Sequence, residues 1–156
     1  MTDRDRDILS MANGSPNIII DAFSFMLGEK LGEGETRAVY DYALDPNFVI
    51  KIAKKHPNDN VLEFDIWHLI KNTTESKWFA ECKWLSPSGH IMLQRKTKPI
   101  KYLPDLLPNV FTDIHIRNFG KIGNQVVCHD YAFSLIRYIY LSKFKLVDWK
   151  KDKMQQ

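Results

Sequence analysis

The chain has 156 residues, of which 44% are hydrophobic and 26% charged, a balance that predicts one folded domain and excludes a disordered or low-complexity chain. Its formal net charge of +3 is only mildly basic, so charge alone gives little reason to expect nucleic-acid binding. Cys82 and Cys128 are too few for a disulfide scaffold and too far apart for a CxxC site, which fits a reducing compartment. No apolar run is long enough for a membrane helix, and the first residues lack the order of a signal peptide. We therefore expect a cytoplasmic protein without membrane contact.

Residues 1–16 combine mixed charges with an Asn-Gly-Ser-Pro turn and are expected to form a flexible arm before a single domain at residues 17–146. Asn17 can cap a short helix, although the β-branched run that follows leaves a strand equally open. Three short segments rich in Val, Ile, Tyr and Phe come next, separated by turns that contain Gly or Pro. They predict an antiparallel meander of strands at residues 26–31, 37–44 and 48–53.

At residues 59–71 the pattern becomes helical, with apolar side chains at three- and four-residue steps. The apolar positions are Leu62, Ile66, Leu69 and Ile70. Glu63 belongs to the buried side of this helix, because its neighbours three, four and seven residues later are apolar. A buried carboxylate needs a cationic partner, and leaving it alone costs about 3–5 kcal/mol.

A hairpin at residues 80–86 and 90–94 is expected to complete the sheet. Three prolines then exclude a long helix between residues 97 and 109. A strand at residues 125–128, a helical stretch at 133–144 and a basic tail at 147–156 are expected to follow. The fold class is therefore α+β, with a five-stranded antiparallel sheet, one packed helix, a mostly irregular segment and a closing helix.

Gly32 and Gly34 lie in a turn between two expected strands, where the missing side chains let backbone N–H groups approach a polyphosphate. A plain hairpin turn would look similar. Lys51 stands in the middle of an apolar strand, where a lysine can also simply extend its ammonium to the surface. The order of glycine turn, strand lysine and helical Glu63 favours a Lys51–Glu63 ion pair that aims the ammonium at a phosphate.

The second half of the chain has a matching pattern. Asp113 and Asn118 have the D-x-x-x-x-N spacing of a kinase catalytic loop, and Asp130 closely follows an apolar strand, as the aspartate of D-F-G does. Taken singly, these could be turn-forming residues and a strand-end cap. Together with the glycine turn, Lys51 and Glu63, they make the chain resemble the protein-kinase-like superfamily, and most of all its small-molecule and atypical branches.

The resemblance implies a nucleotide lobe at residues 17–96 that binds ATP. In it, Gly32 and Gly34 would cover the phosphates, Val39 would contribute to the nucleotide site, and Lys51 would bind the phosphates while Glu63 holds it. The backbone of residues 94–96, beginning with Gln94, would receive the adenine.

The resemblance further implies a reduced catalytic lobe at residues 97–146. Asp113 would act as the base or orient an acceptor hydroxyl, and Asn118 and Asp130 would hold Mg²⁺.

The chain departs from the family pattern at several positions. Arg37 replaces the third glycine of the loop, Glu33 and Glu35 place negative charge near the expected phosphates, and Ala132 replaces the final glycine of D-F-G. Only 24 residues follow Ala132, too few for an activation segment or a peptide-binding lobe. The resemblance therefore describes a minimal kinase-like protein, similar to short kinase-like proteins of phages and bacteria.

Two hypotheses from different classes follow. The first is an ATP- and Mg²⁺-dependent phosphotransferase, and the second is a pseudokinase that binds a host or partner protein. Docking of that partner would use aromatic residues near the end of the chain, namely Phe133, Tyr138, Tyr140, Phe144 and Trp149. Nucleic-acid binding through the terminal lysines is the weakest alternative.

Overall fold

The computed structural model describes residues 24–137 and 143–153. The expected N-terminal arm and the segment that follows Asn17 lie outside the described residues, and so do Tyr138 and Tyr140. The chain divides into two compact units. The first comprises Met1–Phe64 and Glu81–Lys96, and the second comprises Asp65–Ala80 and Thr97–Gln156.

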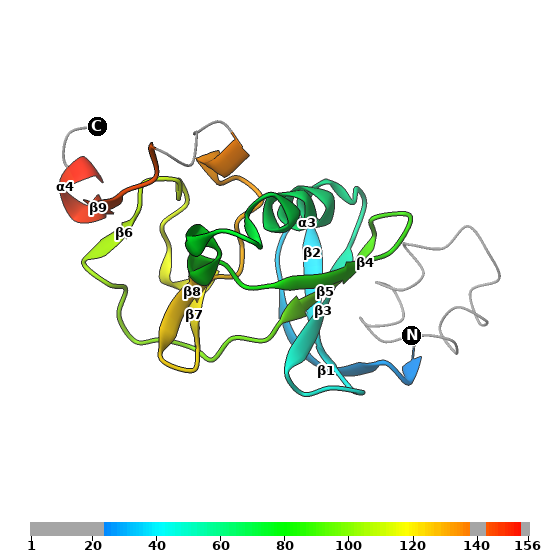
Figure 1. Ribbon diagram of the computed structural model, residues 1–156. Coiled ribbons are helices and arrows are strands. Elements are labelled where there is room, and N and C mark those ends of the chain that lie inside the picture. Colours follow the sequence, from blue (N-terminus) through cyan, green and yellow to red (C-terminus); the bar gives the residue numbers. More distant parts are fainter. Residues whose placement is uncertain (1–23, 138–142, 154–156) are drawn as a thin grey trace. The chain divides into compact units, whose positions relative to one another are not determined.

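The first unit contains a sheet of five antiparallel strands in the order β1-β2-β3-β5-β4 (Figure 1). The strands are β1 (Leu27–Glu33), β2 (Arg37–Tyr42), β3 (Phe48–Ala53), β4 (Cys82–Leu85) and β5 (Ile91–Arg95). The expected meander and the expected hairpin are both confirmed. Because β5 pairs with β3, the hairpin places β5 inside the sheet and β4 at its edge.

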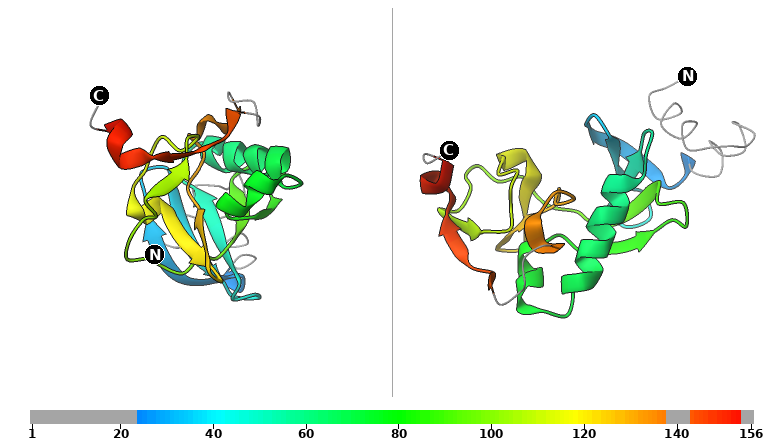
Figure 2. Two further views of the ribbon diagram at one scale, coloured as in Figure 1. Left: turned by 60° about the vertical axis from the view of Figure 1, so that its left-hand side comes forward. Right: turned by 90° about the horizontal axis from the view of Figure 1, so that it is seen from above.

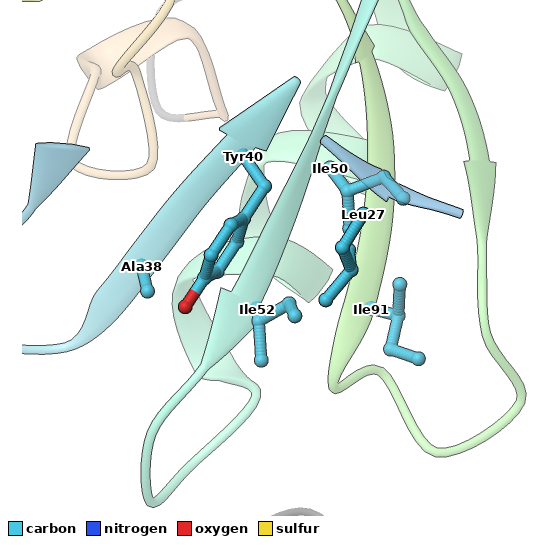
Figure 3. Packing of buried hydrophobic residues seen from close by; sticks show 6 residues of the cluster. All are labelled: Leu27, Ala38, Tyr40, Ile50, Ile52 and Ile91. Carbon is cyan, nitrogen blue, oxygen red and sulfur yellow. The ribbon is translucent and has the colours of Figure 1, made fainter. Parts of the chain in front are cut away.

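The sheet has one apolar face and one face that carries charge. Every residue of β3 is buried, and successive side chains of a strand point to opposite faces. Ile50 and Ile52 pack into an apolar cluster with residues of the neighbouring strands (Figure 3). The cluster consists of Leu27, Ala38, Tyr40, Ile50, Ile52 and Ile91. Lys51, between the two isoleucines, therefore belongs to the opposite face.

Helix α3 (Asn58–Ile70) follows β3 and contributes its first half to the first unit, where it lies against one face of the sheet (Figure 2). The contact of Glu63 with Lys51 identifies this as the charged face. Its buried stripe begins with the polar residues Asn60 and Glu63 and continues with Ile66 and Ile70. Leu69, expected on this face, is 55% exposed. The expectation was wrong there because each helical residue turns by about 100°, which carries Leu69 away from the stripe that contains Ile70.

The second unit is built from short elements. In chain order they are η1 (Thr74–Trp78), β6 (Leu106–Pro108), η2 (Ile116–Asn118), β7 (Phe119–Ile122), β8 (Gln125–Cys128), η3 (Leu135–Arg137), β9 (Leu146–Asp148) and α4 (Trp149–Lys153). Strands β7 and β8 form one antiparallel hairpin, and β6 and β9 form a second antiparallel pair (Figure 1).

Aromatic rings form the centre of the second unit. The ring of Phe79 lies 5.1 Å from those of Phe111 and Tyr131, and Phe111 meets Phe119 edge-on at 5.3 Å. Ring pairs at these distances add to the stability gained by burying the rings. Because Phe111 and Phe119 stand before and after the Asp113–Asn118 segment, their contact fixes both ends of that segment.

The closing helix expected at residues 133–144 is wrong for the described part of that range. There, only the single turn of η3 is helical before residue 138. The N–H of Leu135 donates to the carbonyl of Val110, so this donor is taken by a distant residue and not by the preceding turn. At the other end, the side-chain amide of Asn109 donates to the carbonyl of Lys143, and its backbone N–H donates to the carbonyl of Lys145.

The segment expected to be a basic tail, residues 147–156, contributes to β9 and forms α4. Trp149 donates its indole N–H to the carbonyl of Pro104, and Lys150 forms an ion pair with Asp105 at 2.8 Å. Among the described residues, no helix is long and apolar enough to cross a membrane.

Candidate functional site

A buried ion pair joins β3 to α3 in the first unit. The ammonium Nζ of Lys51 lies 2.9 Å from the carboxylate Oε2 of Glu63, and the two residues are 4% and 0% exposed. Lys51 faces α3 because side chains of a strand alternate between the two faces of the sheet. Glu63 faces the sheet because it belongs to the buried stripe of α3. The pair expected from the sequence is therefore present.

Arg37 is a second cation on the same carboxylate. Its Nη2 lies 2.8 Å from Oε1 of Glu63, so that each carboxylate oxygen faces a different cation. Arg37 begins β2 and pairs with Ala53, and Val39 pairs with Lys51, which places all four residues on one face of the sheet.

Asn60 fastens the start of the helix to the sheet. Its side-chain nitrogen donates to the backbone carbonyls of Lys51, Gly89 and His90 at 3.0–3.3 Å, and its oxygen accepts from Arg37 at 3.4 Å. Since Asn60 precedes Glu63 by about one helical turn, this anchor fixes the position from which the carboxylate reaches the two cations.

The side chain of Gln94 joins the buried cluster around Glu63. Its side chain is fully buried, and Nε2 donates to Glu63 at 3.3 Å and to the sulfur of Cys82 at 3.5 Å. The N–H groups of Arg95 and Lys96 donate to the carbonyls of Glu81 and Asn47. These two N–H groups are therefore already bonded to neighbouring backbone, and the adenine-binding role of this segment stays a prediction.

The electrostatics of the cluster favour an ionised Glu63. Burial alone would raise the pKa of this carboxyl, because a low-dielectric interior disfavours charge. The charges and hydrogen bonds of Arg37 and Lys51 outweigh that effect and lower the pKa from 4.5 to about 2. Glu63 is therefore ionised at neutral pH.

The structure places Gly32 inside β1, paired with Val39, so of the two glycines only Gly34 lies in the turn between β1 and β2. Side chains tie this glycine turn to its surroundings. The N–H of Gly34 donates to the carbonyl of Arg37 at 2.8 Å, and Lys54 donates to the carbonyl of Gly34 at 2.9 Å. Thr36 donates to Asp59 in the first turn of α3 at 2.6 Å. The turn is thus linked to the start of the helix that carries Glu63.

Glu33 does not leave an unbalanced charge in this turn. Lys30 contacts its carboxylate at 2.6 Å and Lys54 also pairs with it. Hydrogen bonds from these two lysines lower the pKa of Glu33 to about 2. The negative charge that the sequence places near the expected phosphates is therefore offset by two cations.

The fold itself does not require glycine at Gly32 or Gly34. A Cβ atom added at Gly32 would meet no atom within 4 Å, and one at Gly34 would come no closer than 3.9 Å to the carbonyl oxygen of Arg37. Neither residue has a positive φ. By contrast, a Cβ at Gly120 would stand 2.4 Å from the side-chain oxygen of Thr97. Glycine at position 120 serves packing, whereas the turn glycines leave open space.

In the second unit, Asp113 and Asn118 come together. The side-chain nitrogen of Asn118 donates to Oδ2 of Asp113 at 2.8 Å and to its backbone carbonyl at 3.1 Å. The N–H of Asn118 donates to the carbonyl of His115, which closes the segment on itself. The five-residue spacing read from the sequence thus corresponds to a direct contact between the two side chains.

Asp130 lies at the same end of the β7–β8 hairpin as Asn118, because the N–H of His129 donates to the carbonyl of Asn118. Asp130 is exposed, and its backbone carbonyl accepts from the thiol of Cys128 at 3.2 Å. His129 bridges Thr97 and the carbonyl of Arg117, with both distances 2.8 Å. Within the described ranges, no group of three or more His, Cys, Asp or Glu side chains could hold a metal ion.

Sequence reasoning missed Arg37 and Asn60 as members of the buried cluster. Strand alternation was the signal for Arg37, because Arg37 pairs with Ala53 and its side chain therefore lies on the same face of the sheet as that of Lys51. The signal for Asn60 was its position three residues before Glu63 on the helix. Burial of these two residues was not expected, because a single arginine or asparagine near a turn is usually exposed.

No protein-family model matches this chain, and no curated protein sequence matches it.

Because Lys51 and Arg37 share the carboxylate of Glu63, we expect the losses of unfolding free energy on substituting them to be non-additive. Lys51→Met and Arg37→Met should each lower the free energy of unfolding by about 1–3 kcal/mol, because the other cation still neutralises Glu63. The double variant should cost at least ~1 kcal/mol more than the sum, because it leaves a buried carboxylate without either cation. Urea unfolding of the four proteins measures this coupling, and strictly additive losses would contradict a shared carboxylate.

The low pKa of Glu63 predicts a specific acid sensitivity. Because the folded-state pKa of about 2 is below the ordinary value of 4.5, ionised Glu63 stabilises the fold above pH 4.5, and this contribution is lost as the pH falls to about 2. The contribution is about 3 kcal/mol.

Urea unfolding as a function of pH in ~0.5 M salt isolates this contribution, because salt screens exposed pairs such as Lys30–Glu33. Glu63→Gln should flatten the profile, whereas Glu33→Gln should change it little. An equal acid dependence in wild type and Glu63→Gln would show that Glu63 does not titrate as stated.

Proposed function

We propose that this chain binds ATP through its first unit, with the ammonium of Lys51 as the phosphate-binding group. The observation that carries the proposal is the buried Lys51–Glu63 pair at 2.9 Å, inside a sheet whose opposite face is apolar. The resemblance of the sequence to the kinase-like superfamily supplies the ligand class.

Net stability compared with an apolar core is a weak reason to place this pair in the interior. Replacing a buried ion pair by apolar residues of similar size is often neutral or stabilising, because both charges must be taken out of water. A buried lysine at a fixed position is, however, what a phosphate-binding site needs, since the ammonium is a compact charge with three donors. The arrangement is therefore better explained by a ligand than by the fold.

The glycine turn supports the same proposal. The space around Gly32 and Gly34 is open, and neither glycine is needed for packing or for a positive φ. The N–H of Gly34 donates to Arg37, so the support is steric: without side chains at these positions, phosphate oxygens can approach the backbone closely. Thr36 attaches the turn to α3, and Lys54, which directly follows β3, attaches it to the end of that strand, so the turn is held at a defined position.

For phosphoryl transfer, the second unit carries the groups that the resemblance assigns. Asp113 would orient an acceptor hydroxyl, and its contact with Asn118 fixes one carboxylate oxygen. The side-chain oxygen of Asn118 and the carboxylate of Asp130 are the oxygen donors that Mg²⁺ takes, usually together with phosphate oxygens. The donor types therefore fit Mg²⁺, whose charge would offset that of the phosphates.

Calorimetric titration with ATP, with and without Mg²⁺, tests the binding proposal. We expect wild type to bind and Lys51→Met to lose at least about tenfold in affinity, because the phosphate loses its cation. Gly34→Ala should fold normally and bind several-fold more weakly, since the added methyl keeps phosphate oxygens from the backbone. Lys55→Met is the matched control, because Lys55 is an exposed cation just after β3.

Equal affinity of wild type and Lys51→Met for ATP would refute the proposed role of Lys51. Absence of any ATP binding by folded wild type would refute the nucleotide-binding proposal itself.

A protein-binding role without catalysis is the second candidate, and exposed apolar side chains of the second unit favour it. Tyr102 and Phe133 are 85% and 68% exposed. Leu106 and Leu146 are each nearly half exposed on the β6–β9 pair. Phe144 and Trp149, expected to contribute to partner docking, are only partly exposed, and Trp149 is hydrogen-bonded to Pro104.

Transfer of radiolabelled γ-phosphate separates the two candidates. A phosphotransferase should label itself or a small hydroxyl acceptor, and Asp113→Asn should lower the rate by about 100-fold or more, because the acceptor loses its base. ATP binding with no Asp113-dependent labelling would favour the protein-binding role.

A further inference from the structure

We propose that Arg37 is a positioning residue for Lys51. By neutralising Glu63 from the second carboxylate oxygen, Arg37 leaves the charge of Lys51 available to an incoming polyphosphate. The proposal rests on the nucleotide-binding function proposed above and extends it to a residue that replaces a loop glycine.

The geometry gives each cation its own oxygen. Arg37 lies 2.8 Å from Oε1 of Glu63, and Lys51 lies 2.9 Å from Oε2. If Lys51 alone faced a buried carboxylate, it would be the main counter-charge of that carboxylate, and leaving it for a phosphate would carry a large penalty. With Arg37 in place, the carboxylate keeps a counter-charge when the ammonium shares its donors with a ligand.

Arg37 is fixed independently of Lys51. Its backbone pairs with Ala53 in the sheet, and Nη1 contacts the side-chain oxygen of Asn60, which is itself held by three backbone carbonyls. A guanidinium stays charged at every accessible pH and presents rigidly oriented donors. An ammonium, in contrast, has three rotatable donors and can serve Glu63 and a phosphate oxygen together.

The summed charge of the three residues distinguishes an electrostatic role of Arg37 from a packing role. The charges of Arg37, Lys51 and Glu63 sum to +1, and Arg37→Met reduces this sum to zero. Adding Glu63→Gln to Arg37→Met restores +1 without restoring any contact of Arg37. A role of Arg37 through charge therefore predicts that the second substitution repairs the first, whereas a role through packing predicts further damage.

The first measurement is calorimetric affinity for ATP with Mg²⁺, at a temperature where all variants are folded. Arg37→Met should bind about tenfold more weakly than wild type. Arg37→Lys and the double variant Arg37→Met/Glu63→Gln should recover most of that loss. Lys55→Met, which removes an exposed charge of the same unit, should bind like wild type.

The second measurement needs no ligand. The exchange of the Lys51 ammonium protons with water, followed by NMR, should slow in Arg37→Met, because Glu63 then holds the ammonium more tightly. The double variant should exchange faster than Arg37→Met. Should Arg37→Met fail to fold, Arg37→Gln replaces it in both measurements, since it keeps donors but not the charge.

Wild-type affinity in Arg37→Met, or no recovery in the double variant, would overturn the proposal. An unchanged rate of ammonium exchange in Arg37→Met would also overturn the proposal, whatever the affinity of that variant for ATP. If wild type binds no ATP while the exchange responds as expected, the nucleotide-binding function falls and the control of Lys51 by Arg37 stands.

Discussion

A single buried carboxylate organises the first unit. Glu63 is fully buried on α3, and a carboxylate at such a position is tolerated only when cations and donors surround it. Lys51 of β3, Arg37 of β2 and Gln94 of β5 all direct nitrogen atoms at it. Three strands and one helix are therefore held in register by one charge, and displacing α3 from the sheet would separate that charge from all three partners.

This constraint explains the unusual polarity of the helix. The buried stripe of α3 starts with Asn60 and Glu63 and becomes apolar only at Ile66 and Ile70. The first half of the helix thus contributes little hydrophobic burial and is fixed by directional contacts. Hydrophobic stabilisation of the sheet comes instead from the opposite face, where Tyr40, Ile50 and Ile52 pack together (Figure 3). Because hydrophobic packing uses one face of the sheet, the other face can carry charged side chains.

The second unit achieves order in a different way. Apart from the end of α3, its described elements are short, and ring contacts of Phe79, Phe111 and Phe119 form its centre. The Asp113–Asn118 segment is short and partly exposed, and it depends on the buried rings at its two ends and on its own hydrogen bonds. Polar groups on such a segment can be held in place without being buried, which suits groups that must reach a ligand.

The sequence by itself determined the five strands, the central helix and the Lys51–Glu63 pair, because pleat and helix periodicity are local properties that fix which face each side chain takes. It also determined the proximity of Asp113 and Asn118, since they lie within one short segment. Only the tertiary structure decided the second cation Arg37, the inward position of Gln94, the bond of Leu135 to Val110 inside the expected closing helix, and the strand Leu146–Asp148. These depend on which strands become neighbours and on the long-range bond between Leu135 and Val110, and local sequence patterns do not specify such pairings.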